Sequence, residues 1–101
     1  MREREIRVVR IYLNERSAHL DRLLERLHDE ERVRGVTVFR AIAGYGDSGR
    51  LHSAKLIDLS LELPIVVEFF DTPERCMTII EHLRQQIKPD HILSWSAHTF
   101  E

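Results

Sequence analysis

One segment constrains the fold of this chain more than any other, because both of its faces need burial. Residues 63–70 read Leu-Pro-Ile-Val-Val-Glu-Phe-Phe, a composition typical of a β-strand. Successive residues of a strand point to opposite faces of its sheet. The two faces of this strand carry Ile65, Val67 and Phe69 on one side and Val66 and Phe70 on the other. A strand with one solvated face alternates apolar and polar residues, so we expect protein on each side of this sheet.

Three further strands and two helices are predicted around this segment. Residues 6–13, 36–43 and 91–99 have the composition of strands. Apolar residues at helical spacing predict helices over 18–34 and 73–87. The apolar stripes are Leu20, Leu23, Leu24 and Leu27 in the first helix, and Cys76, Ile79, Ile80, Leu83 and Ile87 in the second. Ser17 and Gly35 are candidate ends of the first helix. Thr72 before Pro73, or Asp71 with Glu74, is expected to cap the second.

The order β-α-β-β-α-β predicts an α+β domain of the ferredoxin-like type, a four-stranded antiparallel sheet with two helices on one face. Both helices share a face because crossover connections are right-handed. The other face would then be uncovered, although strands 6–13 and 63–70 are apolar on both sides. A second copy of the chain is the simplest cover. The alternative is that a few apolar residues stay exposed, which is common in proteins.

Composition limits the class of protein. A length of 101 residues predicts one domain, 1–101. With 43% hydrophobic and 32% charged residues, the composition is that of a globular protein. No apolar run approaches the roughly 18 residues that span a bilayer, so no direct membrane insertion is expected. A net charge of −2 does not favour nucleic acid as a partner. The start of the chain has no apolar signal segment, and Cys76 is the single cysteine, so we expect a cytoplasmic protein.

A glycine-rich stretch is the candidate ligand site. Residues 44–62 form a connection of unusual length for a small domain and begin Gly-Tyr-Gly-Asp-Ser-Gly. The spacing matches G-x-G-x-x-G, but no helix follows, so a dinucleotide-binding βαβ unit is not indicated. Glycine backbone N–H groups can still converge on an anion, with cationic side chains nearby. The candidate ligand-binding residues are Gly44, Gly46, Gly49, Arg50, His52 and Lys55. The alternative is a surface loop with solvated charges.

Residues 35–46, Gly-Val-Thr-Val-Phe-Arg-Ala-Ile-Ala-Gly-Tyr-Gly, resemble the second strand and loop entry of PII-like proteins. The resemblance is strongest to a PII-like family catalogued as a domain of unknown function. It continues through Leu59-Ser60, the strand at 63–69 and Asp71, and it covers nearly the whole chain.

This resemblance implies a homo-trimer whose sheets line a central core, and a signalling regulator rather than an enzyme. PII proteins bind adenine nucleotides in clefts between subunits, which would make ATP, ADP, AMP or another anionic metabolite the ligand. Gly44 and Gly46 match the loop entry beside that cleft. Lys55 and Asp58 fall in the loop that contacts target proteins, often membrane transporters. The chain departs from PII proteins at Lys88-Pro89-Asp90-His91, where their second phosphate loop carries glycine, and at Ala41, where the closer family tends to have glycine.

Other chemistries have weaker signals. No histidine pair has the i, i+4 spacing of a helical zinc site, although CutA-like copper-tolerance proteins share the trimeric architecture and offer a metal-binding alternative. A ligand-free interaction module is a further alternative. Cys76 lies on an apolar helix stripe and is expected to be buried. Glu68 sits in an apolar strand and is expected to pair with Arg40 or Arg10. No nucleophile and base pair is visible, so no catalytic residue is assigned.

Overall fold

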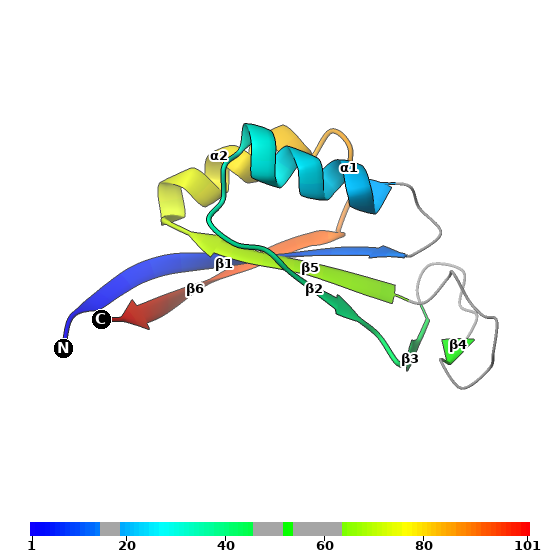
Figure 1. Cartoon of the computed structure of the whole chain (residues 1–101), viewed down its shortest axis with the longest axis horizontal. Helices are drawn as coiled ribbons and strands as arrows, with labels where there is room; N and C mark the ends of the chain where they lie inside the picture. Colours follow the sequence, from blue (N-terminus) through cyan, green and yellow to red (C-terminus); the bar gives the residue numbers. More distant parts are fainter. Residues whose placement is uncertain (15–18, 46–51, 54–63) are drawn as a thin grey trace.

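The computed structural model describes residues 1–14, 19–45, 52–53 and 64–101 (Figure 1). Its elements are β1 (Glu3–Asn14), α1 (His19–Glu25), the π-helix η1 (Arg26–Glu30), β2 (Thr37–Arg40), β3 (Ala43–Gly44), β4 (His52–Ser53), β5 (Pro64–Asp71), α2 (Pro73–Leu83) and β6 (Ile92–Phe100). The observed order matches the predicted one, with a small additional ribbon of β3 and β4 between β2 and β5.

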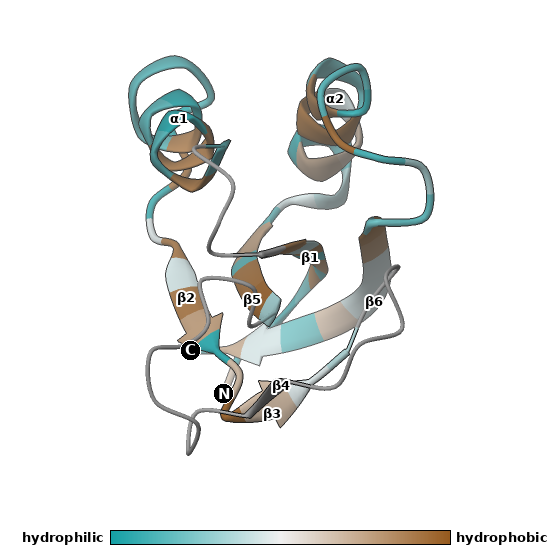
Figure 2. Cartoon of the chain, turned by 90° about the vertical axis from the view of Figure 1, so that its right-hand side faces the viewer, coloured by the Kyte–Doolittle hydropathy of each residue, from teal (hydrophilic) through white to brown (hydrophobic). Residues whose placement is uncertain are grey.

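The main sheet has the strand order β2-β5-β1-β6, and every neighbouring pair is antiparallel. Helices α1 and α2 lie together on one face of this sheet (Figure 1) and turn their apolar sides towards it (Figure 2). The predicted ferredoxin-like α+β fold is therefore confirmed. Two right-handed crossovers explain why both helices of the described residues lie on one face.

The hydrophobic core lies between this sheet and the helices. Its buried members are Val9, Ile11, Leu23, Leu27, Val33, Val67, Phe69, Cys76, Ile79 and Leu83. The residues from β1 and β5 alternate along their strands, as the period of two requires, and those from α1, η1 and α2 follow the predicted stripes. Ile80 and Ile87 pack against the core while partly buried. The expected inner faces of both helices are thus confirmed.

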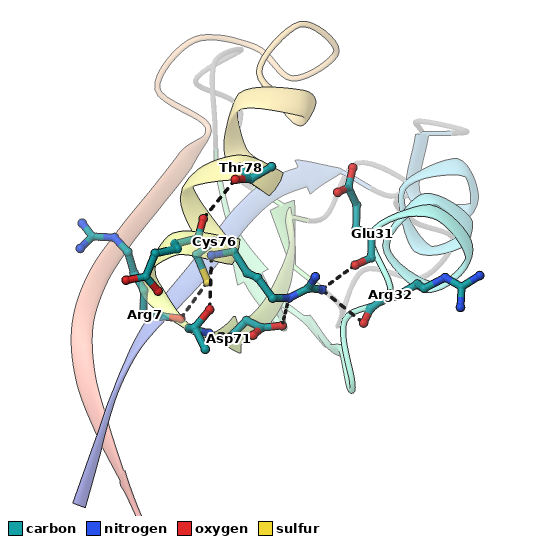
Figure 3. Close-up of polar contacts among 9 residues, drawn as sticks. Arg7, Glu31, Arg32, Asp71, Cys76 and Thr78 are labelled. Carbon is teal, nitrogen blue, oxygen red and sulfur yellow. Dashed lines mark hydrogen bonds and ion pairs between the residues drawn. The ribbon is translucent and has the colours of Figure 1, made fainter.

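The first helix differs from its prediction over 18–34, because regular α-helix ends at Glu25 and a π-helical turn follows. The Glu31 N–H donates to the Arg26 carbonyl at 2.9 Å, a five-residue spacing. Arg32 then adopts a left-handed backbone with φ of 57°. The Arg75 guanidinium from α2 donates to the Glu31 carbonyl at 2.6 Å, capping this end of the helix (Figure 3). The helix therefore stops through a tertiary contact, before the predicted stop at Gly35.

The other predicted strands and helix agree in position and differ at their ends. The predicted strand 36–43 is interrupted, since its pairing with β5 ends near Ala41, whose N–H donates to the Pro64 carbonyl at 3.0 Å. The chain then pairs Ala43 and Gly44 with Ser53 and His52 in the separate β3–β4 ribbon. Helix α2 ends at Leu83 rather than 87.

The start of α2 follows the predicted capping. Thr72 is the N-cap, and its hydroxyl accepts a hydrogen bond from the Arg75 N–H at 3.3 Å, with Pro73 at the first helical position. Asp71 Oδ1 accepts from the Thr72 N–H at 2.7 Å, and Asp71 Oδ2 accepts from the Arg75 side chain at 3.0 Å. Asp71 therefore supports the cap from outside the helix, which fixes where α2 leaves β5.

Replacing Leu83 with alanine tests the core. Leu83 is fully buried in α2, whereas Met77 on the same helix is 54% exposed. Leu83→Ala is expected to lower the free energy of unfolding by about 2–5 kcal/mol, because it leaves a cavity. Met77→Ala, the matched control, is expected to change it by less than about 0.5 kcal/mol. Guanidinium-induced unfolding measures both, and equal effects would contradict the packing described above.

Candidate functional site

The face of the sheet opposite α1 and α2 exposes large apolar side chains. Phe39 on β2, Phe70 on β5, and Leu93 and Trp95 on β6 are between 39% and 55% exposed. The strand registers place them on one face, since Val8 opposes both Phe70 and Trp95, and Phe39 opposes Val66. We call this set of residues the open face. A set of exposed aromatic and apolar side chains on one face is typical of an interaction surface.

An ion pair crosses the open face. The Arg10 Nε donates to Glu68 Oε1 at 2.6 Å, and the Arg10 guanidinium lies 5.4 Å from the centroid of the Trp95 ring. The hydrogen bond to Glu68 raises the pKa of Arg10, with a further contribution from Tyr12. The structure confirms Arg10 as a partner of Glu68, and the two residues are directly opposite in the register. The pair satisfies both charges among apolar neighbours.

The predicted glycine-rich site is described only in part. Gly44 lies in β3 and His52 in β4, and the two residues are directly paired. A Cβ built on Gly44 would lie 3.2 Å from Pro64 Cγ, so a larger residue there would require the Pro64 ring at the start of β5 to shift by a few tenths of an ångström. Gly46, Gly49, Arg50 and Lys55, together with Asp58, lie outside the described residues. The structure thus brings the two described positions, Gly44 and His52, onto one ribbon beside the entry to β5.

A groove of about 610 Å³ lies at the other end of β2. It is formed by the segment 34–37, the start of β1, the end of β5 and the end of β6. Phe70 and Phe100 contribute aromatic surface, and Thr37, Thr72 and Thr99 contribute hydroxyl groups. Sequence reasoning missed this groove, because its walls come from four segments that become neighbours only in the folded sheet. The run Arg34-Gly35 before β2 is its one local signal.

The charges around the groove are largely neutralised in pairs. Glu68 pairs with Arg10, Asp71 with Arg75, and Glu101 with Arg4. Within the described part of the chain, Arg34 is a groove cation that makes no ion pair. The groove therefore offers an aromatic surface, hydroxyl groups and an available positive charge. This combination suits a ligand with a flat apolar part and an anionic group.

Behind the sheet, a polar cluster fastens the first helix to α2. The buried Glu31 carboxylate lies 3.0 Å from His82 Nδ1 and 3.4 Å from Arg26 Nε. The backbone carbonyls of Glu31 and Arg32 accept from Arg75, at 2.6 Å and 3.4 Å (Figure 3). A buried carboxylate needs such partners. The cluster explains why the π-helical turn is held against α2, and it assigns these residues to the scaffold.

Cys76 has the environment of a structural cysteine, as predicted. Its side chain is fully buried in the core, and its Sγ donates to the Arg7 carbonyl at 3.3 Å (Figure 3). Burial raises the pKa of the Cys76 thiol. Since the thiolate is the reactive form, burial favours the less reactive thiol of Cys76.

A metal site and a membrane-spanning helix are two further features to look for in the described residues. The described ranges contain no group of three or more histidine, cysteine, aspartate or glutamate side chains placed to hold a metal ion. None of the helices in the described part of the chain has the length and hydropathy that a bilayer crossing requires.

Comparison with known families covers almost the entire sequence. The family DUF190, described as Uncharacterized ACR, matches residues 6–99. This chain belongs to the DUF190 family. One UPF0166 protein of Aquifex aeolicus is 44% identical over 62 residues, covering 61% of this chain and 58% of the relative. Another is 31% identical over 85 residues, covering 84% of this chain and 86% of the relative.

Solved structures show that this DUF190 protein has a PII-like fold, which confirms the resemblance found in the sequence. The crystal structure of a protein from Thermus thermophilus, described as a PII-like signaling protein, aligns with a TM-score of 0.64 and 17% sequence identity. The alignment covers 98% of this chain and 91% of that protein. The PII-like protein CPII of Thiomonas intermedia, bound to ADP and bicarbonate, aligns with a TM-score of 0.62 and 15% identity, over 97% and 89%. At these identities the likeness is one of fold.

The raised pKa of Cys76 gives a testable pH dependence. The folded state disfavours the Cys76 thiolate. The stability that the protonated thiol contributes is therefore complete below the ordinary thiol pKa of about 8.5. It is lost as the pH rises through the pKa of Cys76 in the folded protein. We expect iodoacetamide to modify the native protein far more slowly than the protein unfolded in guanidinium. We also expect stability above a pH of about 8.5 to fall more in the wild type than in Cys76→Ala. Equal labelling of folded and unfolded protein would contradict the burial of this thiol.

Proposed function

We propose that this DUF190 protein is a trimeric, cytoplasmic PII-like regulator rather than an enzyme. It binds a small anionic ligand in clefts between subunits and contacts a partner protein through the 44–62 segment. The observation that carries the proposal is the PII-like fold combined with an apolar open face that its own helices leave uncovered. In a trimer of this fold the three open faces meet in the centre, which buries Phe70 and Trp95 and sets sheet edges of adjacent subunits against each other.

An adenine nucleotide is the first choice of ligand. CPII, which has this fold, is described in complexes with ADP, AMP and bicarbonate. The groove with Arg34 and the glycine-rich entry at Gly44 lie at opposite ends of β2. Seven extended residues separate Thr37 from Gly44, roughly 23 Å at about 3.3 Å per residue, which is longer than AMP or ADP. We therefore place the nucleotide at the glycine-rich entry, where backbone N–H groups would bind its anionic group.

The sequence 88–91 affects which nucleotide is preferred. Lys88-Pro89-Asp90-His91 contains no glycine, and Asp90 adds a negative charge where PII proteins hold phosphate. A carboxylate repels a phosphate chain. We therefore propose AMP or ADP, with few phosphate groups, in preference to ATP.

Ligand binding would signal by changing the conformation of the 44–62 segment. A ligand held by the glycine-rich entry and by Arg50 and Lys55 would favour one conformation of the 44–62 segment. Such a change alters the surface that a partner meets. The resemblance to PII proteins makes a membrane transporter the first class of partner to examine.

Thermal-shift measurements with AMP, ADP, ATP and bicarbonate test ligand binding. A ligand present at about one hundred times its Kd adds about 2.7 kcal/mol of stability, so the wild type is expected to melt several degrees higher with AMP or ADP. Arg50→Ala is expected to lose most of this shift. The matched control is Arg22→Ala, an exposed arginine on α1, which is expected to keep the shift.

Two results would count against this function. A wild-type protein that assembles but responds to none of these compounds would favour the ligand-free interaction module. Equal losses in Arg22→Ala and Arg50→Ala would place the ligand away from the glycine-rich segment.

A further inference from the structure

The groove at the start of β2 has no role in the proposed function, although its size is that of a ligand site. Its volume of about 610 Å³ falls within the range of pockets that hold small molecules, roughly 300–1,000 Å³. Extended chain of roughly 23 Å separates Thr37 in its wall from Gly44. A nucleotide at the glycine-rich entry would therefore not reach the groove.

Helix α2 holds the segment 34–37, one wall of the groove, in place. The Arg75 guanidinium donates to the carbonyls of Glu31 and Arg32, just before this segment, at 2.6 Å and 3.4 Å. The Arg75 Nε also donates to Asp71 Oδ2, which lines the groove, at 3.0 Å (Figure 3). One side chain thus ties the chain that enters β2 to the end of β5. Walls that are fixed in advance reduce the entropy lost when a ligand binds.

The charges in the groove favour a ligand with one anionic group. Arg34 is exposed and makes no ion pair with the residues that the structure describes. Glu68, Asp71 and Glu101 also line the groove, and each of them is paired with an arginine. These carboxylates would repel a chain of phosphates, whereas a single carboxylate can pair with the Arg34 guanidinium. The charge balance therefore favours a monoanion over a nucleotide.

The aromatic surface of the groove indicates the other part of the ligand. Phe70 is 55% exposed and Phe100 is 62% exposed, and both residues line the groove together with Ile6 and Val36. Aromatic rings attract one another in offset or edge-to-face arrangements, so a flat ring is favoured here over a small polar molecule. Of the open-face residues the groove includes only Phe70. Assembly through the open face and a ligand in the groove would therefore use largely different residues.

We propose that the groove binds a small aromatic monocarboxylate, at a second site separate from that of the nucleotide. The ring lies against Phe70 and Phe100, and the carboxylate accepts hydrogen bonds from the Arg34 guanidinium. The hydroxyl groups of Thr37 and Thr99, which also line the groove, are further donors. This site goes beyond the proposed function and does not depend on it, since it would make the protein responsive to an aromatic acid as well.

Binding of phenylacetate to the full wild-type chain tests this site. In two-dimensional amide NMR spectra, phenylacetate is expected to shift the signals of residues 34–37, 70–72 and 99–101 with one saturable Kd. Phenylacetamide keeps the shape of this probe without the charge, and acetate keeps the charge without the ring. Each is expected to bind at least about tenfold more weakly, because it lacks either the charged hydrogen bond or the aromatic contact.

Arginine variants locate the carboxylate. Arg34→Ala is expected to weaken phenylacetate binding at least about tenfold and to leave phenylacetamide binding unchanged, while Arg34→Lys keeps the charge and is expected to lose less. The matched control is Arg32→Ala, which removes an exposed side chain of the same stretch and keeps the carbonyl that accepts from Arg75. It is expected to bind as the wild type does. Circular dichroism would verify that all three variants fold, as expected for exposed positions.

Competition with AMP separates this site from the nucleotide site. Saturating AMP is expected to leave the Kd of phenylacetate unchanged. Displacement of phenylacetate by AMP would assign the groove to the nucleotide and overturn the second site, while leaving the proposed regulator in place. Shifts that do not saturate, or equal Kd values for the wild type and Arg34→Ala, would overturn it as well. A protein that binds phenylacetate but no nucleotide would keep the second site and contradict the nucleotide of the proposed function.

Discussion

The structure depends on one constraint: its central strands are apolar on both sides, and a chain of this topology has helices for only one side. Val67 and Phe69 of β5 are almost fully buried under the helices, while Phe70 is 55% exposed on the other face. Burying apolar surface is worth roughly 25 cal/mol per Å², so the open face retains a substantial driving force for association. The Arg10–Glu68 pair interrupts that face without leaving either charge unpaired. The proposed assembly would thus follow from the same pattern that forms the core.

Assembly and the candidate site are physically connected. The groove is formed by the ends of four segments of the sheet, and the glycine-rich entry follows the edge strand β2. In the proposed trimer, both would lie where a neighbouring subunit approaches. A ligand placed there would be held by two chains, so its binding would stabilise the assembly by mass action. On the helical side of the sheet, Glu31, His82 and Arg75 instead connect the end of the first helix to α2.

Features fixed by local pattern could be predicted from the sequence. The two faces of β5, the inner stripe of α2 and the Thr72 cap each follow from residue spacing, and all three are confirmed. The sequence indicates Arg40 or Arg10 as the partner of Glu68, because a carboxylate in an apolar strand needs a cationic partner. Features fixed by tertiary contacts could not be predicted. The π-helical turn depends on Arg75, which lies 44 residues beyond Glu31 in the chain. The break after Arg40 depends on where Pro64 begins β5, and the groove depends on four separate segments meeting. Of the predicted ligand site, Gly44 and His52 are paired in space, while Gly46, Gly49, Arg50 and Lys55 lie outside the described residues and stay predictions.

The central claim is that sister subunits cover the open face. The most direct measurement is sedimentation equilibrium of the wild type at low micromolar concentration, with the emission of Trp95, the single tryptophan, recorded on the same samples. The account predicts the mass of three chains of 11.9 kDa and blue-shifted emission from a buried indole, which moves to the red on dilution. A single species with the mass of one chain and fully solvated emission would contradict it.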